Sequence, residues 1–366
     1  MFFTFILFIL SGTANARTYD GYRADYPKGA FCSAMGGACA ADVDPENAYF
    51  QNPASLAASE LGVAFDGDYN GSANLEPGMK AKNTVSESSY MGGISYSWKS
   101  FGIGFSVDGR TDVVQSQASL LDDQGKTQVL NLKDTSTRIE LKIPIAVHIA
   151  QKWTFGFSLT GLVYSESISL SGNSSASVAK LDKNLSQAFS IGTIYSASNA
   201  WSFGSWFKTP LTYFENITIH TETFGNTLDY NEDIALRVPW VWSTGLRWSP
   251  GPRGRYLFFD LDLIGATQDG FLLTYDTFAG AVADRGLSRK GKTISIEPHL
   301  GFTSPWTSSS RGTYLLGSYY ENGRTQGYSG RLHGTAGIAY DLKNWVQGLI
   351  GMDIASDFFQ LLVTVR

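Results

Sequence analysis

The feature that most constrains this chain is the alternation of apolar and polar residues along much of its length. From Leu61 onward, apolar side chains occupy every second position for about ten residues before a turn rich in Gly, Ser, Asn or Asp. In the stretch 138–149, isoleucine, leucine and valine fill the odd positions, and mostly polar or small residues fill the even ones. Successive side chains of a strand point to opposite faces, whereas a helix would place these residues on every side. The pattern therefore predicts an all-β protein whose strands have one apolar face.

The alternation recurs in about fifteen segments, which are joined by connections of two kinds. Expected strands begin at Leu61 and cover 90–98, 101–110, 138–149, 153–160, 187–198, 201–207, 213–221, 239–248, 257–263, 294–302, 313–320, 332–342, 345–356 and 358–365. Tight turns are expected at 99–100, 249–254 and 343–344, and longer polar loops at 108–137, 171–184, 225–237 and 269–292. Short turns on one rim, long loops on the other and an even number of strands are typical of bacterial outer-membrane barrels. We therefore expect a transmembrane antiparallel β-barrel of about 14 strands, or about 16 if more segments pair.

Composition helps to separate this interpretation from a soluble β-sandwich or propeller, whose strands would also alternate. Charged residues make up 17% of the chain, against about 25% in soluble domains. Aromatic residues gather near the ends of expected strands, as in the girdles of membrane barrels. They include Trp98, Phe101, Trp153, Trp201, Trp206, Trp240, Trp242, Trp248 and Trp345. The net charge of -5 provides no basic surface for phosphate groups, so no nucleic-acid partner is expected.

Residues 1–16 have the pattern of a secretion signal. The apolar run from Phe2 to Leu10 precedes Ala14-Asn15-Ala16, an A-x-A cleavage site. A buried N-terminal helix is the alternative. Cys32 and Cys39 are the two cysteines of the chain, and in an exported protein they are a candidate disulfide pair.

Residues 17–60 do not alternate and are rich in small side chains. A barrel of about fourteen strands is wide enough to hold either a channel or a plug, and a segment of this length is suited to fill it. Pro53 restricts Asn52 to an extended or turn conformation, so the chain is expected to bend there. The bend is interpreted either as a movable gate or as a rigid structural turn.

The run from Gly36-Gly37-Ala38 through Ala41-Asp42 to Asn52-Pro53-Ala54-Ser55-Leu56-Ala57 resembles the N-terminal hatch of the long-chain fatty-acid transporter family (FadL/TodX type). Segments 201–211 and 239–262 agree more loosely with later strands of that family. The resemblance implies a fourteen-stranded barrel (61–366) in the bacterial outer membrane, plugged by a hatch (17–60) and passing hydrophobic molecules such as long-chain fatty acids. Asp42, Asn52, Pro53 and Ala54 are then hatch residues. Related barrels of the PorV type serve secretion machinery, so the alternative is a scaffold or shuttle barrel with a secreted-protein partner.

Several charged residues are expected to face the lumen because they alternate with apolar neighbours. The main candidates are Arg138, Glu140, Lys142, Asp260 and Asp262, joined by Glu297, His299 and Asp353. They are interpreted either as shaping a permeation path or latching the hatch, or as solvated lumen residues without individual roles. The sequence has no G-x-S-x-G motif, and its four histidines are widely separated, so neither an enzyme nor a metal or other cofactor is expected. The expected partners are a hydrophobic small molecule and outer-membrane lipid.

Overall fold

The computed structural model describes most of the chain after residue 28. The described residues are 29–43, 45–58, 61–75, 82–98, 100–121, 127–150, 152–171, 176–181, 184–223, 226–251, 254–266, 293–307, 311–323, 330–343, 346–355 and 358–365. The expected leader, residues 17–28 of the expected hatch, Trp345 and the expected loop at 269–292 lie outside them.

Within these residues, three short helices precede seventeen strands. The helices are α2 (Ala30–Ala34), α3 (Pro45–Phe50) and the 3-10 helix η1 (Pro53–Ala58). The strands are β1 (Leu61–Leu75), β2 (Lys82–Trp98), β3 (Phe101–Leu121), β4 (Thr127–Ile149), β5 (Trp153–Ser171), β6 (Ala176–Leu181), β7 (Asn184–Ser196), β8 (Trp201–Lys208), β9 (Leu211–Thr223), β10 (Asn226–Val238), β11 (Val241–Trp248), β12 (Tyr256–Ile264), β13 (Ser295–Pro305), β14 (Gly312–Glu321), β15 (Arg331–Lys343), β16 (Val346–Ala355) and β17 (Phe358–Val365). No helix in the described part of the chain is long and apolar enough to cross a membrane.

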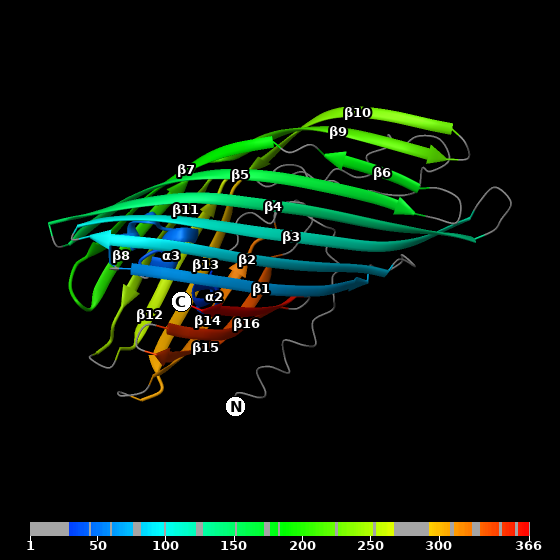
Figure 1. The fold of residues 1–366 in the computed structure, drawn as a ribbon. Helices are drawn as coiled ribbons and strands as arrows, with labels where there is room; N and C mark the ends of the chain where they lie inside the picture. The colour runs from blue at the N-terminus through cyan, green and yellow to red at the C-terminus, as the bar shows by residue number, and fades with distance from the viewer. Residues whose placement is uncertain are drawn as a thin grey trace.

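All strands belong to one antiparallel sheet. Strand β1 pairs with β2 on one side and with β17, the last strand, on the other. Followed from neighbour to neighbour, the pairings pass from β1 through β5, then β7, β8 and β11 to β17, and return to β1. This circuit contains fourteen strands. Figure 1 shows the strands arranged around the blue helices of the N-terminal segment. The predicted all-β antiparallel architecture is therefore confirmed.

The other three strands prolong members of the circuit at the end where β3, β4 and β5 also extend (Figure 1). Strand β8 ends at Lys208, which pairs with Val241, and the same register resumes after a gap of two residues where Leu211 pairs with Val238. Pro210 lies in this gap, and a proline has no N–H to donate to a ladder. The β9–β10 hairpin thus continues the β8–β11 pair, and β6 pairs with β5 and β9 beside it.

Three of the expected loops are wrong. Strands β3 and β4 run through most of 108–137, β10 occupies 226–238, and β6 lies within 171–184. These stretches contain many polar residues, which led to their interpretation as loops. In 226–238, however, apolar residues do alternate, at Leu228, Tyr230, Ile234, Leu236 and Val238. Backbone pairing between neighbours forms a ladder without requiring an apolar face.

The two faces of the sheet differ as the alternation predicts. On β4, Leu141, Ile143 and Val147 are exposed, whereas Glu140 and Lys142 between them are buried. The exposed face continues round the circuit. It includes Ile94, Ile103, Phe155, Phe157, Ile191, Phe203, Phe259, Ile296, Leu300, Leu316, Leu332, Ile338, Ile350, Leu361 and Val363. The apolar side chains therefore point away from the N-terminal segment, and the polar ones point toward it.

The predicted aromatic belt holds for most of its described members. Trp98, Trp153, Trp201 and Trp242 are exposed, and Trp201 stacks on Trp248 with ring centroids 5.4 Å apart. Trp206 is the exception. It points inward and packs with Ala40, Val241 and Ile264, because its position on β8 has the opposite parity from Trp201. Assigning Trp206 to the outer belt was wrong.

Candidate functional site

The N-terminal segment (residues 29–58) is folded by its own contacts. A disulfide joins Cys32 to Cys39 and encloses the turn after α2. The amide of Asn47 donates hydrogen bonds to the carbonyl of Cys39 (2.6 Å) and to Ser55 Oγ (2.9 Å). Ser55 Oγ in turn donates to the carbonyl of Asp42 (2.6 Å). These buried bonds connect the disulfide half of the segment to the half that contains α3 and η1.

This segment contacts every strand of the circuit. Helix α2 contacts β1 and β14 to β17, α3 contacts β1 to β4, and η1 contacts β2 to β5 and β7. The chain between the helices reaches the remaining strands. Ala41 lies against Gly204 on β8, Asp42 faces Arg247 on β11, and Ala40 bonds to Asp260 on β12. Gly36 bonds to His299 on β13. The segment is therefore surrounded by the sheet, as the position of α2 and α3 in Figure 1 also shows.

Glycines in the strands make room for the backbone of the N-terminal segment. A Cβ at Gly204 on β8 would overlap the carbonyl of Ala40, and one at Gly156 on β5 would overlap the Pro53–Ala54 peptide. Wall glycines elsewhere in the circuit meet the segment in the same way. They are Gly93 and Gly104 against Tyr49, Gly192 against Asn52, Gly301 against Met35, Gly317 against Met35 and Gly36, and Gly337 against Ala34. The wall and the segment are therefore fitted to each other at many separate points, and any side chain larger than hydrogen would force them apart.

Gly36 shows the same fit from the side of the segment. It has φ +68, a backbone conformation that side-chain-bearing residues rarely adopt. A Cβ there would lie 2.7 Å from the amide nitrogen of Ser318 and 2.8 Å from the carbonyl of Leu300. The turn closed by the disulfide is thus held against β13 and β14.

Asn52, one of the predicted hatch residues, connects three parts of the molecule. Its side chain is fully buried. The amide donates to the carbonyl of Ala40 (2.7 Å) and to the carbonyl of Thr193 on β7 (3.3 Å), while Oδ1 accepts from the amide of Ala54 (3.1 Å). Pro53 begins η1. The predicted bend is therefore present, and it is tied both to the segment and to the wall.

Asp42, the remaining predicted hatch residue, is nearly buried. Its carboxylate lies 3.9 Å from the guanidinium of Arg247 on β11. Arg247 also lies over the ring of Tyr256, 5.3 Å from the ring centroid. Asp42 thus faces a wall cation as well as bonding within the segment through its carbonyl.

Of the predicted lumen residues, Glu140 is the centre of a charge cluster. Its carboxylate forms an ion pair with Arg138 on its own strand and lies 3.1 Å from Lys142 Nζ. Lys208, at the end of β8, lies 3.9 Å away. Because removing one member of a buried ion pair leaves an uncompensated charge, this cluster constrains the wall where β4 approaches the β8–β9 break.

Asp260 and Asp262 belong to a second cluster with His299. Asp260 Oδ2 accepts a hydrogen bond from the amide of Ala40 (2.6 Å). His299 Nδ1 lies 2.7 Å from the carbonyl of Gly36, and its Nε2 lies 3.2 Å from Asp262 Oδ2. The structure therefore brings both predicted acids to the interface with the N-terminal segment. It separates them from the Glu140 cluster, so the predicted lumen residues form two groups.

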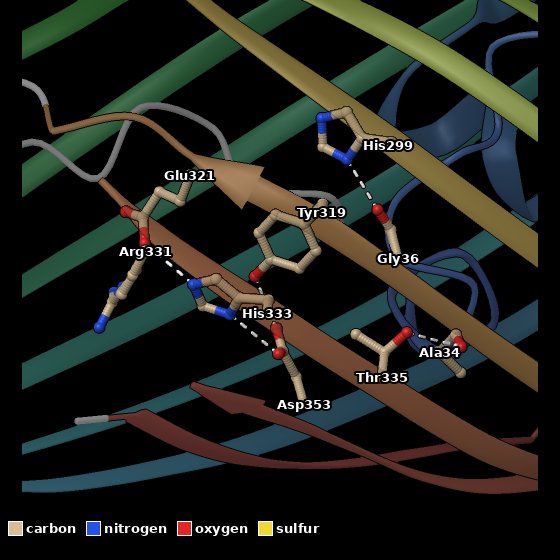
Figure 2. A network of polar contacts seen from close by, with 9 residues as sticks. All are labelled: Ala34, Gly36, His299, Tyr319, Glu321, Arg331, His333, Thr335 and Asp353. Carbon is tan, nitrogen blue, oxygen red and sulfur yellow. Dashed lines mark hydrogen bonds and ion pairs between the residues drawn. The ribbon is translucent and has the colours of Figure 1, made fainter. Parts of the chain in front are cut away.

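The second cluster continues into a network that the sequence interpretation did not include, apart from Asp353. The ring of Tyr319 stacks between His299 and His333, with centroid distances of 5.4 and 4.1 Å. His333 Nδ1 lies 2.9 Å from Asp353 Oδ1, and its Nε2 lies 3.1 Å from Glu321 Oε2. Tyr319 donates to Asp353 Oδ2 (2.6 Å). Figure 2 shows these rings in line between β13 and β16.

Arg331 and Thr335 complete the network at its two ends. Arg331 Nε donates to Glu321, and Thr335 Oγ1 donates to the carbonyl of Ala34 (2.9 Å). Strand parity was the available signal. Arg331, His333 and Thr335 alternate with the exposed Leu332 on β15, as Tyr319 and Glu321 alternate with Tyr320 on β14. Their convergence depends on the strand register, which sequence alone does not give.

Comparison with known proteins finds several solved structures with this fold. The chain is similar to a Pseudomonas aeruginosa FadL homologue (12% identity, 98% of each chain covered, TM-score 0.67). It is also similar to the Ralstonia pickettii toluene transporter TbuX (14% identity, 94% of this chain and 97% of that chain, TM-score 0.63) and the Pseudomonas putida toluene transporter TodX (12% identity, 92% and 96%, TM-score 0.63). The molecule therefore has the fold shared by these transporters. No family model and no curated protein matches the sequence.

Proposed function

We propose that this protein is a bacterial outer-membrane channel that gives hydrophobic small molecules passive passage across the membrane. In this proposal the fourteen-strand circuit is a closed barrel, and the N-terminal segment, with residues 17–28 before it, is its plug. The observation that supports this proposal is that the usual distribution of polar and apolar side chains between surface and interior is reversed. Large apolar side chains are exposed on the outer face, while charged ones such as Glu140, Asp260 and His333 are buried on the inner face. Such a surface is stable where hydrocarbon surrounds the molecule.

The comparisons support hydrophobic compounds as the class of solute. The similar structures include toluene transporters, a monoaromatic hydrocarbon channel and a FadL homologue. Toluene and monoaromatic hydrocarbons, which the descriptions of three of these structures name, are hydrophobic compounds. The sequence resemblance implies the same class of solute for this chain. Long-chain fatty acids and monoaromatic hydrocarbons are therefore the candidate solutes. No observation of the structure favours the alternative of a scaffold for protein secretion.

The route we propose passes beside the plug to an interruption in the wall. Strands β3 and β4 pair up to Ile103 and Ile145, and pairing resumes in the same register at Ser106 and Lys142. The two positions between them on each strand are not paired, and one of these residues is Pro144, which has no N–H to donate. Pro144 is buried on the inner face, next to Tyr49 of the plug, at Gly104. An unpaired stretch of wall beside the plug provides a side exit toward lipid.

Uptake into vesicles tests the proposal. The protein is reconstituted in vesicles with lipopolysaccharide in the outer leaflet, because hydrophobic solutes cross that leaflet poorly. Labelled oleate and labelled toluene are added separately, and their arrival inside is compared with protein-free vesicles. We expect faster entry of at least one solute and unchanged entry of a small sugar. Equal entry with and without protein, or a co-purifying secreted protein without solute flux, contradicts the proposal.

A matched pair of proline variants tests the exit. Pro144→Thr restores an N–H at the interruption and should slow uptake. Pro298→Thr replaces an exposed strand proline at a position where β12 and β13 pair without interruption, and should leave uptake unchanged. Normal uptake by Pro144→Thr, with the channel otherwise active, places the exit elsewhere.

A further inference from the structure

We propose that His299 and His333 form a proton-dependent latch that fastens the disulfide turn of the plug to the barrel wall. The proposal rests on the enclosed position of the plug and not on the identity of the solute. It is carried by the contacts around the two imidazole rings, which come from adjacent parts of one buried network (Figure 2).

Each ring has an oxygen acceptor at both of its nitrogens. His299 faces the carbonyl of Gly36 at 2.7 Å and the Asp262 carboxylate at 3.2 Å. His333 faces Asp353 at 2.9 Å and Glu321 at 3.1 Å. A neutral imidazole has one N–H donor and one bare nitrogen, so it leaves a lone pair against one of these oxygens. Only the imidazolium carries an N–H on both nitrogens. It alone presents a donor to both acceptors of His333, and a positive charge to Asp262, which His299 Nε2 contacts as an ion pair without a hydrogen bond.

The carbonyl of Gly36 determines which ring nitrogen of His299 carries a hydrogen. A carbonyl oxygen accepts and never donates, so the nitrogen that faces it must carry the hydrogen. The other nitrogen then faces Asp262, whose ionised form also only accepts. The charged ring therefore joins the plug backbone to the β12 carboxylate.

Tyr319 couples the two histidines. Its ring lies nearly parallel to both, with interplanar angles of 17° to His299 and 15° to His333. The face of an aromatic ring attracts cations, so Tyr319 stabilises the charged form on either side. Its hydroxyl donates to Asp353, which also holds His333. Loss of a proton from one ring therefore alters the surroundings of the other.

The charged and titratable groups around the rings come from every neighbouring strand. They are Asp260 and Asp262 on β12, Glu297 on β13, Tyr319 and Glu321 on β14, Arg331 on β15 and Asp353 on β16. Carboxylates outnumber cations in this set. Raising the pH removes the second N–H of each ring. The hydrogen of His299 stays on the nitrogen that faces Gly36, so that bond persists but loses its charge assistance and weakens. The plug turn should then be held less firmly against β13 while the sheet remains intact.

Nitrogen-15 NMR of the full-length protein in detergent tests the charge state directly. Labelled histidine gives at most four pairs of ring-nitrogen signals, one pair for each of the four histidines, and single His→Gln variants assign them. We expect His299 and His333 in neutral buffer to show hydrogen on both ring nitrogens. If either ring is neutral there, the latch as described is overturned.

Hydrogen exchange tests the mechanical consequence. The probe is the protection of the peptide covering 30–42, whose Gly36 and Gly37 amides bond within the turn, corrected for the intrinsic pH dependence of exchange. As the pH rises through the titration that NMR records, we expect protection in the wild type to fall about tenfold, the effect of replacing a charge-assisted hydrogen bond with a neutral one. His299→Gln should have low protection at every pH.

His148→Gln is the control, because His148 lies at the far end of β4 and contacts Thr154 instead of the plug. It should behave as the wild type. Protection that does not follow the histidine titration, or equal behaviour of His299→Gln and His148→Gln, overturns the proposal. Neither measurement requires transport, so the latch is tested independently of the channel function.

Discussion

Gly204 on β8 lies directly against the carbonyl of Ala40, and its missing side chain is what allows the N-terminal segment to reach the sheet there. A Cβ at this position would also lie 2.6 Å from the Cα of Ala41. Both neighbours are backbone atoms, which cannot rotate away as the end of a side chain does. The contact thus ties the plug to strands that are far from it in sequence.

Gly204→Ala should therefore loosen the plug. Overpacking a tight contact costs about 1 to 3 kcal/mol, and we expect a lower thermal midpoint and faster protease cleavage between α2 and α3. Gly348→Ala is the control, because it also lies in a strand but its nearest neighbour is Leu342 Cδ1 at 3.7 Å. A Gly204→Ala protein as resistant as Gly348→Ala would show that the plug does not lie against β8.

Asn52→Leu should separate the two functions considered for the Asn52–Pro53 bend. The leucine removes two buried donors, so the carbonyls of Ala40 and Thr193 lose their hydrogen bonds. The cost is about 1 to 3 kcal/mol for each carbonyl left without a donor. If the bend is a rigid tie, the variant exposes residues 40–54 to hydrogen exchange. Gln51→Leu is the comparison, because the Gln51 amide makes a weaker contact, 3.6 Å from Cys32 Sγ. Exchange that is the same in both variants would argue against Asn52 as a tie.

Breaking the disulfide should affect the plug and leave the sheet. The Cys32–Cys39 bridge has a sequence separation of 7, and closing a loop of this size contributes about 2.5 kcal/mol in the chain-entropy model. We expect the double variant Cys32→Ser, Cys39→Ser to keep its strand signal in circular dichroism. Protease resistance of residues 29–42 should fall, because Gly36 and the carbonyl of Cys39 are both held in place by this loop. Loss of the strand signal would instead mean that the barrel requires the bridge to form.

The parts of this fold that follow from sequence are those in which each side chain has one dominant environment. Leu141 and Ile143 lie on the exposed face and Glu140 on the buried one, so parity alone orients β4. Parity does not give the strand register, and the register is what places Tyr319 beside His299 and His333. It also does not show the extension of β3, where polar residues interrupt the alternation, whereas the alternation in β10 is present in the sequence and was overlooked.

The candidate site could also be predicted in part from sequence, because some of its residues stand in a recognisable local pattern. Asn52 and Asp42 lie in a run of small residues, and such a run is conspicuous in the chain. The wall glycines that lie against the N-terminal segment are scattered over eight strands and form a pattern only after the sheet is assembled. Trp206 was assigned to the outer belt because it lies near a strand end. Its parity on β8 decides its orientation instead, and it points inward.

An arginine on the outer face tests whether hydrocarbon surrounds the barrel. Ile350, near the middle of β16, is 64% exposed. In a soluble protein Ile350→Arg would be neutral or would improve solubility, but at the centre of a bilayer an arginine costs about 2 to 4 kcal/mol. We expect the variant to lower the free energy of unfolding in lipid vesicles by that amount, measured by urea titration of tryptophan fluorescence. Gln187→Arg, at an exposed polar position near one end of β7, should cost about 1 kcal/mol or less. Equal stability of the two variants, or an Ile350→Arg protein that stays dispersed in buffer without detergent, would contradict the membrane-spanning arrangement, because only a surrounding hydrocarbon layer makes the two outward positions differ.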